Sequence, residues 1–298
     1  MFIKNHSATI NAQAKLFVLI TATLLVLLLI LISPTATRNP RPRIVANLLP
    51  SWSTINGSDQ YGQWADLTIG GDALRFRLVH SGKYLMGSPI SEPGRNDDEG
   101  QKSVSISNPY WISDSECTQA FWSSIMTSNP SKIKGDKLPV VNISWDDCQV
   151  FLGRLNRKVH GLSARLPSEA EWEYACRAGT QSSFPCNADE SCWSQENSGL
   201  TLHAVRLKLP NPWGLYDMNG NTYEWCSDWY ASYSIRPLVD PDEAPNPALP
   251  LKVIRGGSFT RSLTQCRSAT RGVNPPQLGA IDIGFRFLID QSSTRESR

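Results

Sequence analysis

The chain has 298 residues, of which 40% are hydrophobic and 19% charged, an ordinary composition for one large or two small globular domains. Its formal net charge of +2 divides unevenly, because residues 1–50 carry +5 and no acid, which leaves −3 for the remainder. A nucleic-acid-binding surface must be basic to neutralise phosphates, so the slightly acidic body argues against a nucleic-acid partner.

An uncharged apolar run extends from Leu16 to Ile32, behind Lys4 and Lys15. As a helix it would be ~25 Å long, near the lower limit for crossing a bilayer. We therefore interpret residues 1–33 as a signal anchor, with a signal peptide as the alternative. Either interpretation places the body outside the cytoplasm, secreted or anchored to an inner membrane through residues 16–32, in a bacterial periplasm.

The rest of the chain divides into a linker, one domain and a tail. Residues 34–73 are rich in Pro, Ser, Asn and Gly without sustained periodicity and are predicted to be a linker. Residues 74–290 carry the patterns of a folded domain, and the polar residues 291–298 are predicted to be a tail. Alternation over Leu74–Val79 and the apolar run Pro109–Ile112 predict strands.

Two helices carry clear start signals, after a shorter helix expected over Cys117–Met126. Ser144 with Asp147, and Ser168 with Glu171, place an N-cap and an acid at N3, the pattern of a capping box. After residue 180, frequent Pro and Gly predict turns and short strands. We expect an α+β fold with little regular secondary structure.

Five motifs follow one another along the domain. They are Tyr-Leu-Met-Gly-Ser at 84–88, Arg-Leu-Pro-Ser-Glu-Ala-Glu-Trp-Glu-Tyr at 165–174, Gly-Leu-Tyr-Asp-Met-Asn-Gly-Asn-Thr-Tyr-Glu-Trp at 214–225, Arg-Gly-Gly-Ser-Phe at 255–259 and Gly-Phe-Arg at 284–286. In this order they resemble the formylglycine-generating enzyme family, also called the sulfatase-modifying-factor domain. The resemblance implies a core similar to that of C-type lectins.

The resemblance also implies structural calcium. The family's calcium segment matches Asn219, Asn221, Thr222 and Glu224, and a second calcium site would begin at Asn197. Carboxylate, amide and carbonyl oxygens are the ligands that calcium accepts. The alternative is a buried turn in which Glu224 accepts backbone hydrogen bonds.

Seven cysteines fit an oxidising compartment. The family's structural disulfide implies a pairing of Cys176 with Cys266. Cys186 and Cys192 flank a loop-like segment and could close a small hairpin disulfide. The pairing of the other three stays open: Cys117, Cys148 and Cys226.

In active family members two cysteines bind copper(I), and a substrate cysteine is oxidised to formylglycine. Counted from Ser258, the first position is Arg261 and the second is Cys266. Copper(I) requires soft ligands, and one thiolate is a poor site. We therefore do not expect copper.

The remaining candidates lie on or near the loop after the two glycines. Ser258, Trp225, Arg261 and Cys266 match positions near the family's active site, but Ser258 lacks an evident base and is favoured as a turn cap. Polar ligand contacts could come from Thr260, Arg261 and Gln265. The side chains of Arg267 and Arg271 could either line this groove or anchor carboxylates inside the protein.

Three functions compete. The first is a factor that matures a protein or peptide by oxidation without the two-cysteine copper site. The second is a non-catalytic module with a lectin-like core, which binds a ligand or protein through the loop of residues 259–265 or stabilises a complex. The third is a true formylglycine-generating oxidase acting on sulfatases.

Overall fold

The computed structural model describes residues 50–233, 238–241 and 250–291, which belong to one structural unit. The apolar run at 16–32 and all but the first residue of the predicted tail lie outside these ranges. Within them, no helix is both long and apolar enough to cross a membrane.

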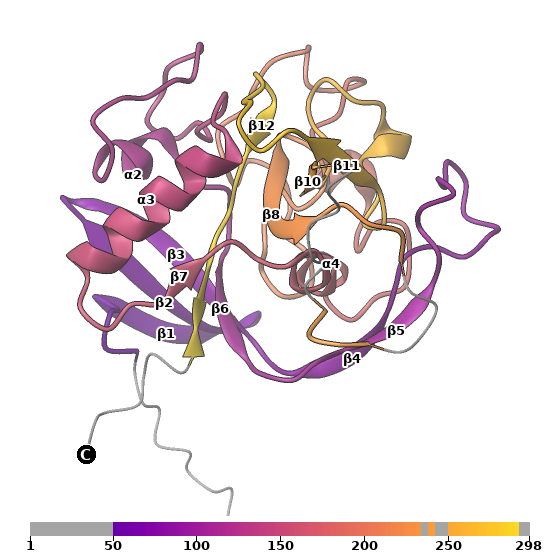
Figure 1. Ribbon diagram of the computed structural model, residues 1–298, viewed down its shortest axis with the longest axis horizontal. Coiled ribbons are helices and arrows are strands. Elements are labelled where there is room, and N and C mark those ends of the chain that lie inside the picture. The colour runs from indigo at the N-terminus through magenta and orange to yellow at the C-terminus, as the bar shows by residue number, and fades with distance from the viewer. Residues whose placement is uncertain (1–49, 234–237, 242–249, 292–298) are drawn as a thin grey trace, which may run out of the picture. The chain divides into compact units, whose positions relative to one another are not determined.

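An antiparallel six-stranded sheet forms one side of the molecule (Figure 1). Its strands, in spatial order, are β1 (Ile55–Asp59), β2 (Gly62–Ile69), β3 (Asp72–Val79), β6 (Tyr110–Ser113), β13 (Leu288–Asp290) and β7 (Ala164–Arg165). The predicted strands at 74–79 and 109–112 are confirmed as β3 and β6. The last residues of the domain thus pair with strands near its beginning.

The predicted linker extends too far, because its residues 55–69 form β1 and β2. Ala65, Leu67 and Ile69 alternate inward along β2 and are buried. Gly70 and Gly71, with φ of 62° and 97°, make the two-residue turn into β3, a backbone conformation that favours glycine. The polar residues of β1, at the edge of the sheet, gave no alternation from which a strand could be predicted.

The helices are α2 (Gln119–Ser123), α3 (Trp145–Lys158), α4 (Glu169–Arg177), α5 (Ala188–Ser191) and the 3₁₀ turn η1 (Leu263–Gln265). Both predicted capping boxes are confirmed, at the first turns of α3 and α4. The helix predicted over 117–126 is shorter, and Thr118 caps it. Between α4 and β8, where few regular elements were predicted, the structure contains only α5.

A four-stranded sheet lies on the other side of α4 from β4 and β5 (Figure 1). Its order is β11 (Arg271–Asn274), β10 (Lys252–Arg255), β8 (Tyr223–Trp229) and β12 (Ile283–Gly284). The third sheet is β4 (Gly82–Met86), β5 (Lys102–Ile106) and β9 (Leu238–Val239). The motif-bearing segments therefore converge on α4 and β8.

Aromatic side chains fill the core between α2, α3 and the six-stranded sheet. The Trp122 and Phe151 rings stack with centroids 5.1 Å apart, and Phe285 and Phe287 meet Phe151 edge-on at 5.3 and 5.9 Å. These contacts bury large apolar areas and add specific ring geometry, which helps a domain with so few regular elements to keep one structure.

Fully buried ion pairs join the motifs to one another. Glu224 on β8 receives two hydrogen bonds from Arg286, Nε to Oε2 at 2.6 Å and Nη2 to Oε1 at 2.8 Å, and neither side chain is exposed. Trp172 on α4 donates its indole N–H to the same carboxylate at 2.6 Å. A buried carboxylate is tolerated here because both oxygens are paired.

Removal of the negative charge at Glu224 should therefore destabilise the protein strongly. Glu224→Gln leaves Arg286 buried without its counter-ion, which costs about 3–5 kcal/mol of unfolding free energy. Guanidinium denaturation measures the loss. Glu190→Gln, at an exposed glutamate, is the matched control and should change stability by less than about 0.5 kcal/mol. Equal stability of the two variants would contradict the assignment.

Candidate functional site

The loop after Gly256 and Gly257 is held to the chain before β12 by one carboxylate. Asp282 Oδ2 accepts hydrogen bonds from the hydroxyls of Ser258, at 2.8 Å, and Thr260, at 2.7 Å. Ser258 Oγ also accepts the backbone N–H of Thr260 at 3.3 Å. No histidine contacts Ser258 in the described chain, and His203 directs Nε2 to the Ser198 carbonyl at 2.8 Å. Ser258 therefore has the environment of a turn cap rather than of an activated nucleophile.

The other candidates around this loop divide by exposure. Arg261 is exposed, and its guanidinium carbon lies 5.7 Å from the centroid of the Tyr223 ring. Gln265 is exposed as well. Trp225 is fully buried and donates its indole N–H to the Ile143 carbonyl at 3.1 Å, so a ligand at the surface cannot reach it.

The two arginines predicted for the groove face inward. Arg267 binds both oxygens of Glu99, at 2.8 and 2.7 Å, and also Glu92 at 2.6 Å. Arg271 binds both oxygens of Glu169 at 2.7 and 2.9 Å. Of the two roles left open for these arginines, the structure shows the internal anchor. Ligand contact by Arg267 or Arg271 is wrong, because their charges are buried and already paired.

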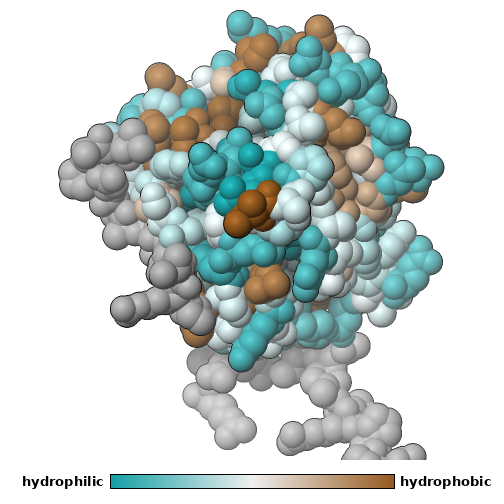
Figure 2. Space-filling view, turned by 90° about the vertical axis from the view of Figure 1, so that its right-hand side faces the viewer, coloured by the Kyte–Doolittle hydropathy of each residue, from teal (hydrophilic) through white to brown (hydrophobic). Residues whose placement is uncertain are grey.

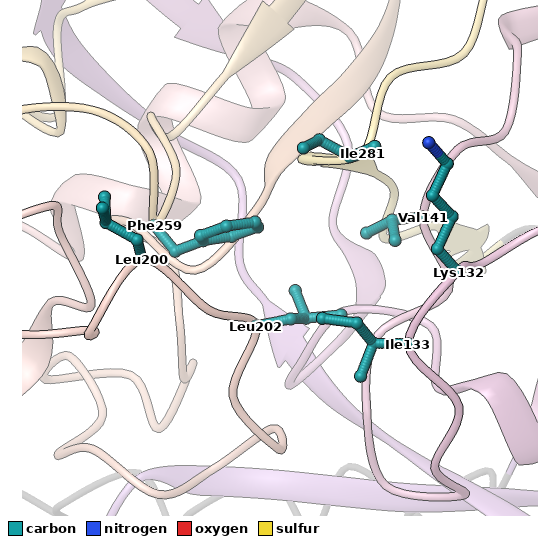
Figure 3. Close-up of a pocket in the computed structure, with 7 residues that line it drawn as sticks. All are labelled: Lys132, Ile133, Val141, Leu200, Leu202, Phe259 and Ile281. Atoms are coloured by element: carbon teal, nitrogen blue, oxygen red, sulfur yellow. The ribbon is translucent and has the colours of Figure 1, made fainter.

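An apolar pocket opens beside the loop, with a cavity volume of about 160 Å³. Seven residues line it: Lys132, Ile133, Val141, Leu200, Leu202, Phe259 and Ile281. Figure 3 shows the Phe259 ring and the aliphatic side chains arranged around a common space, with Lys132 at its edge. We call it the Phe259 pocket. It is large enough for one apolar side chain.

Three of the six apolar side chains that line the Phe259 pocket are exposed, whereas Val141, Leu202 and Phe259 are buried. Ile133, Leu200 and Ile281 are 49%, 61% and 50% exposed. Grouped exposed apolar side chains mark binding surfaces more often than scattered ones do. The face shown in Figure 2 carries apolar residues in small groups separated by hydrophilic ones. Lys132 is the charged residue of the lining.

Backbone and side-chain hydrogen bonds fix the wall that carries Phe259. The Phe259 N–H donates to the Asn221 carbonyl at 3.0 Å, and the Ser198 hydroxyl donates to the Phe259 carbonyl at 3.0 Å. The lining residues come from four segments of the chain, at 132–141, 200–202, 259 and 281. Sequence reasoning assigned only the loop of residues 259–265 to the site. The sequence shows that residues 133, 200 and 281 are apolar, but only the fold shows that their side chains are exposed and lie together.

The predicted calcium ligands do not gather around one point. Both Glu224 oxygens belong to Arg286 and Trp172. Asn219 donates to the Cys266 carbonyl at 2.7 Å, and Asn197 donates to the Cys192 carbonyl at 2.9 Å and accepts the Ser194 N–H at 2.9 Å. Glu224 and Asn197 therefore do not fit a calcium ion, because their oxygens are already engaged.

Asn221 and Thr222 instead contact Glu116, which the sequence analysis did not single out. Glu116 Oε1 accepts the Asn221 amide at 3.0 Å and the Thr222 hydroxyl at 3.2 Å. Glu116 Oε2 and Asp217 Oδ1 are buried with no hydrogen-bond partner. Burial raises the pKa of both acids, to about 6 for Asp217, and the neighbouring Asp217 and Glu224 raise that of Glu116 further.

Two unpartnered carboxylate oxygens inside a protein are costly unless a cation or a proton satisfies them. Hard oxygen donors of this kind fit calcium. In the part of the chain that the structure describes, no three His, Cys, Asp or Glu side chains are grouped as ligands of one metal ion. A cation at Glu116 would therefore also use amide, hydroxyl or carbonyl oxygens.

All seven cysteines are free thiols in the structure. Cys176 Sγ lies 3.8 Å from the Met218 carbonyl and from Asn219 Oδ1. The pairing of Cys176 with Cys266 stays a prediction. Cys186 Sγ lies 3.9 Å from the Pro210 carbonyl, and the pairing of Cys186 with Cys192 also stays a prediction.

Cys266 does have a sulfur neighbour, which is Cys192. A side-chain hydrogen bond between the two thiols, together with burial, raises the pKa of Cys192 well above its usual value. The sequence analysis paired Cys266 with Cys176 and did not consider Cys192 as its neighbour. Both cysteines are fully buried. A catalytic copper centre must be reached by oxygen and a substrate cysteine, so the pair does not fit that role.

The comparisons with known proteins identify the family. Residues 73–291 match the sulfatase-modifying factor enzyme 1-like domain. The chain belongs to this family. It is 33% identical over 181 residues to the formylglycine-generating enzyme of Streptomyces coelicolor, a match that covers 53% of the chain and 55% of the relative. The chain thus spans little more than half of that relative's length.

Solved structures of the same fold agree with the α+β assignment. The variable protein 1 of Treponema denticola superposes with a TM-score of 0.68 at 25% identity, over 76% of this chain and 99% of that one. PvdO from Pseudomonas aeruginosa gives a TM-score of 0.66 at 23% identity, over 80% and 98%. The fold is therefore the formylglycine-generating-enzyme and C-type-lectin-like one.

Proposed function

We propose that this sulfatase-modifying-factor domain binds a peptide segment of a partner protein and takes one apolar side chain into the Phe259 pocket. The observation that carries the proposal is the group of half-exposed Ile133, Leu200 and Ile281 around a cavity of about 160 Å³. Burying these side chains against a ligand would release about 25 cal/mol per Å² of apolar surface. The loop of residues 261–265 lies beside the pocket, and its exposed side chains, Arg261, Thr264 and Gln265, could make polar contacts with the same peptide.

The positive charge of Lys132 at the edge of the pocket should favour peptides that carry an acidic residue. Lys132 is the charged residue of the lining, and it is exposed. An acidic residue next to the apolar side chain of the ligand would pair with the Lys132 ammonium group. The proposed ligand is therefore a segment in which a Leu, Ile or Phe neighbours an Asp or Glu.

Selection from a displayed library of random peptides tests this proposal. The full chain should enrich peptides that carry an apolar residue beside an acidic one. Leu200→Asp should weaken binding of the enriched peptides by at least about tenfold, since it places a charge in the apolar lining. Lys132→Glu should weaken the same peptides less and favour basic ones.

The matched control is Leu207→Asp, at a leucine that is 63% exposed and does not line the pocket. It should bind the enriched peptides as the wild type does. Failure to enrich any peptide class, or equal binding by Leu200→Asp and Leu207→Asp, would contradict a role of the pocket in peptide binding.

A second candidate function is oxidation of a substrate cysteine, since the matched relative from Streptomyces coelicolor is named a formylglycine-generating enzyme and two thiols lie next to each other here. Against it stand Arg261 at the first cysteine position and the burial of Cys192 and Cys266. The structure contains no exposed thiol pair among its described residues. Peptide binding is therefore the better supported function.

Incubation with a Cys-x-Pro-x-Arg peptide, copper(I), a reductant and oxygen separates the two candidates. We expect no aldehyde product by mass spectrometry, with the Streptomyces coelicolor enzyme as the positive control. Formation of product by the wild type, and its loss in Cys266→Ala, would instead establish the oxidase.

We also propose that the unpartnered oxygens of Glu116 and Asp217, rather than Glu224, hold a structural calcium ion. Calcium in place of a chelator should raise the melting temperature, by the equivalent of about 2.7 kcal/mol at a hundredfold excess over Kd. Glu116→Gln should abolish the shift. Glu224→Gln should lower the melting temperature yet keep the calcium shift. No response of the wild type to calcium would contradict the ion.

The location of the domain is a further part of the proposal. The apolar run at 16–32 supports a membrane-anchored or secreted body outside the cytoplasm. A fusion to a periplasmic reporter enzyme would measure it, and activity of a cytoplasmic reporter at the same position would contradict it.

A further inference from the structure

Two loops that are distant in sequence bring their cysteine sulfurs together beside the Phe259 pocket. Cys192 follows α5, and Cys266 follows η1. Cys192 Sγ lies against Gly220 and Cys266 Sγ against Gly257, and the Gly220 N–H donates to the Gly256 carbonyl at 2.8 Å, so the two sulfurs belong to adjacent backbone segments. Both side chains are fully buried, and Cys266 raises the pKa of Cys192. Cys266 Sγ also lies 3.8 Å from the Ser258 carbonyl.

The backbone around both sulfurs is arranged to hold them in place. Asn197 donates to the Cys192 carbonyl at 2.9 Å, and Asn219 donates to the Cys266 carbonyl at 2.7 Å. The chain between them is fixed as well, since the Gly220 N–H donates to Gly256 at 2.8 Å and the Asn221 N–H donates to Trp193 at 2.8 Å.

Two glycines make room for the sulfurs. A side-chain carbon at Gly220 would lie 2.7 Å from Cys192 Sγ, and one at Gly257 would lie 2.6 Å from Cys266 Sγ. Both glycines have positive φ, 82° and 73°. The two sulfurs occupy the space that side chains at these positions would need.

We propose that Cys192 and Cys266 form a disulfide that joins the two loops beside the Phe259 pocket. The proposal rests on the contacts of the two sulfurs and not on the ligand of the pocket. In the step, the two thiols react with a disulfide donor R–S–S–R, a low-molecular-weight or protein disulfide. One sulfur–sulfur bond forms between Cys192 and Cys266, the donor bond breaks, and the donor leaves as two R–SH that carry the two protons.

A disulfide suits this place better than a soft metal ion does. Copper(I) bound by two thiolates would bury a net negative charge, whereas a disulfide is neutral. The charged groups that act on Cys192 are Lys208 and Glu196, and their effects oppose each other. Lys208 and Glu196 therefore do not together favour a thiolate at Cys192.

The burial of the sulfurs determines when the bond can form. Exchange requires a thiolate that is accessible to the donor, and the folded protein offers neither for Cys192. The bond should therefore form before the two loops close, and once buried it should resist reduction. It would act as a permanent cross-link rather than as a switch.

The cross-link would tie together two walls of the pocket. Leu200 and Leu202 follow Cys192 in the chain, and Phe259 precedes Cys266. Loops without regular structure are usually the least stable part of a fold. A covalent bond between them keeps the pocket formed in the absence of ligand, which lowers the ordering cost of binding.

Peptide mapping and melting temperatures test the cross-link. The full chain, purified under oxidising conditions and alkylated after denaturation, should yield a linked peptide that contains Cys192 and Cys266. Reduction during unfolding and refolding should lower the melting temperature by about 5–15 °C. In Cys192→Ala and in Cys266→Ala, the oxidised and the reduced protein should have the same melting temperature.

Cys226→Ala is the matched control, because Cys226 is equally buried. Trp145 donates its indole N–H to the Cys226 backbone carbonyl, which the substitution leaves in place. It should keep the linked peptide and the redox difference, whatever its own stability. The proposal is overturned if Cys192 and Cys266 are both alkylated in oxidised protein. It is likewise overturned if the native protein retains copper(I) against a chelator and Cys192→Ala does not, since that result assigns the pair to a soft metal.

Discussion

The rest of the domain depends on one buried ion pair, that of Glu224 with Arg286. It joins the Asn-Gly-Asn-Thr-Tyr-Glu-Trp motif on β8 to the Gly-Phe-Arg motif between β12 and β13, and Trp172 brings α4 to the same carboxylate. Two charges are taken out of water here, and their desolvation is offset only because each oxygen of the carboxylate has a partner. Conservative changes such as Arg to Lys could not reproduce this arrangement, because only a guanidinium donates two parallel hydrogen bonds. The sequence suggests calcium binding as the role of the Asn-Gly-Asn-Thr-Tyr-Glu-Trp motif. In the structure, its Glu224 instead joins β8 to Arg286 and Trp172.

The same device recurs around α4, so the irregular half of the domain is held by arginines rather than by ladders of strands. Glu173 pairs with Arg255 and Arg177, and Glu169 pairs with Arg271. Arg267 reaches across to Glu99 and Glu92, and so fixes the acidic loop between β4 and β5. Because these charges are committed inside the protein, the residues left to meet a ligand are apolar ones around the Phe259 pocket and a few exposed polar ones. The character of the binding surface follows from the scaffold.

Sequence reasoning reached local features and missed those that depend on distant contacts. Ser144 and Ser168 cap their helices as the pattern predicts, because a capping box is formed within four residues. β1 was assigned to a linker, since an edge strand with polar side chains shows no alternation. The sequence allows Arg267 and Arg271 either to contact a ligand or to anchor carboxylates inside the protein. Only the positions of Glu99 and Glu169 in the fold distinguish these two roles. Glu116 gave no signal, because its importance arises from Asn221 and Thr222, more than a hundred residues away.

The two kinds of linkage in the domain act on different states of the chain. Buried ion pairs stabilise the folded state through geometry, and each becomes a liability when one partner is lost. A Cys192–Cys266 bond would instead restrict the unfolded chain, by closing a long loop that includes most of the irregular segment. The arginine pairs connect α4 to the sheets. Among the described residues, no ion pair joins the loop after α5 to the loop after η1. Near these loops, Glu196 accepts a hydrogen bond from the Leu263 backbone N–H at 3.0 Å. A covalent bond at that position would therefore supply order where the ion-pair network ends, which is also where the Phe259 pocket lies.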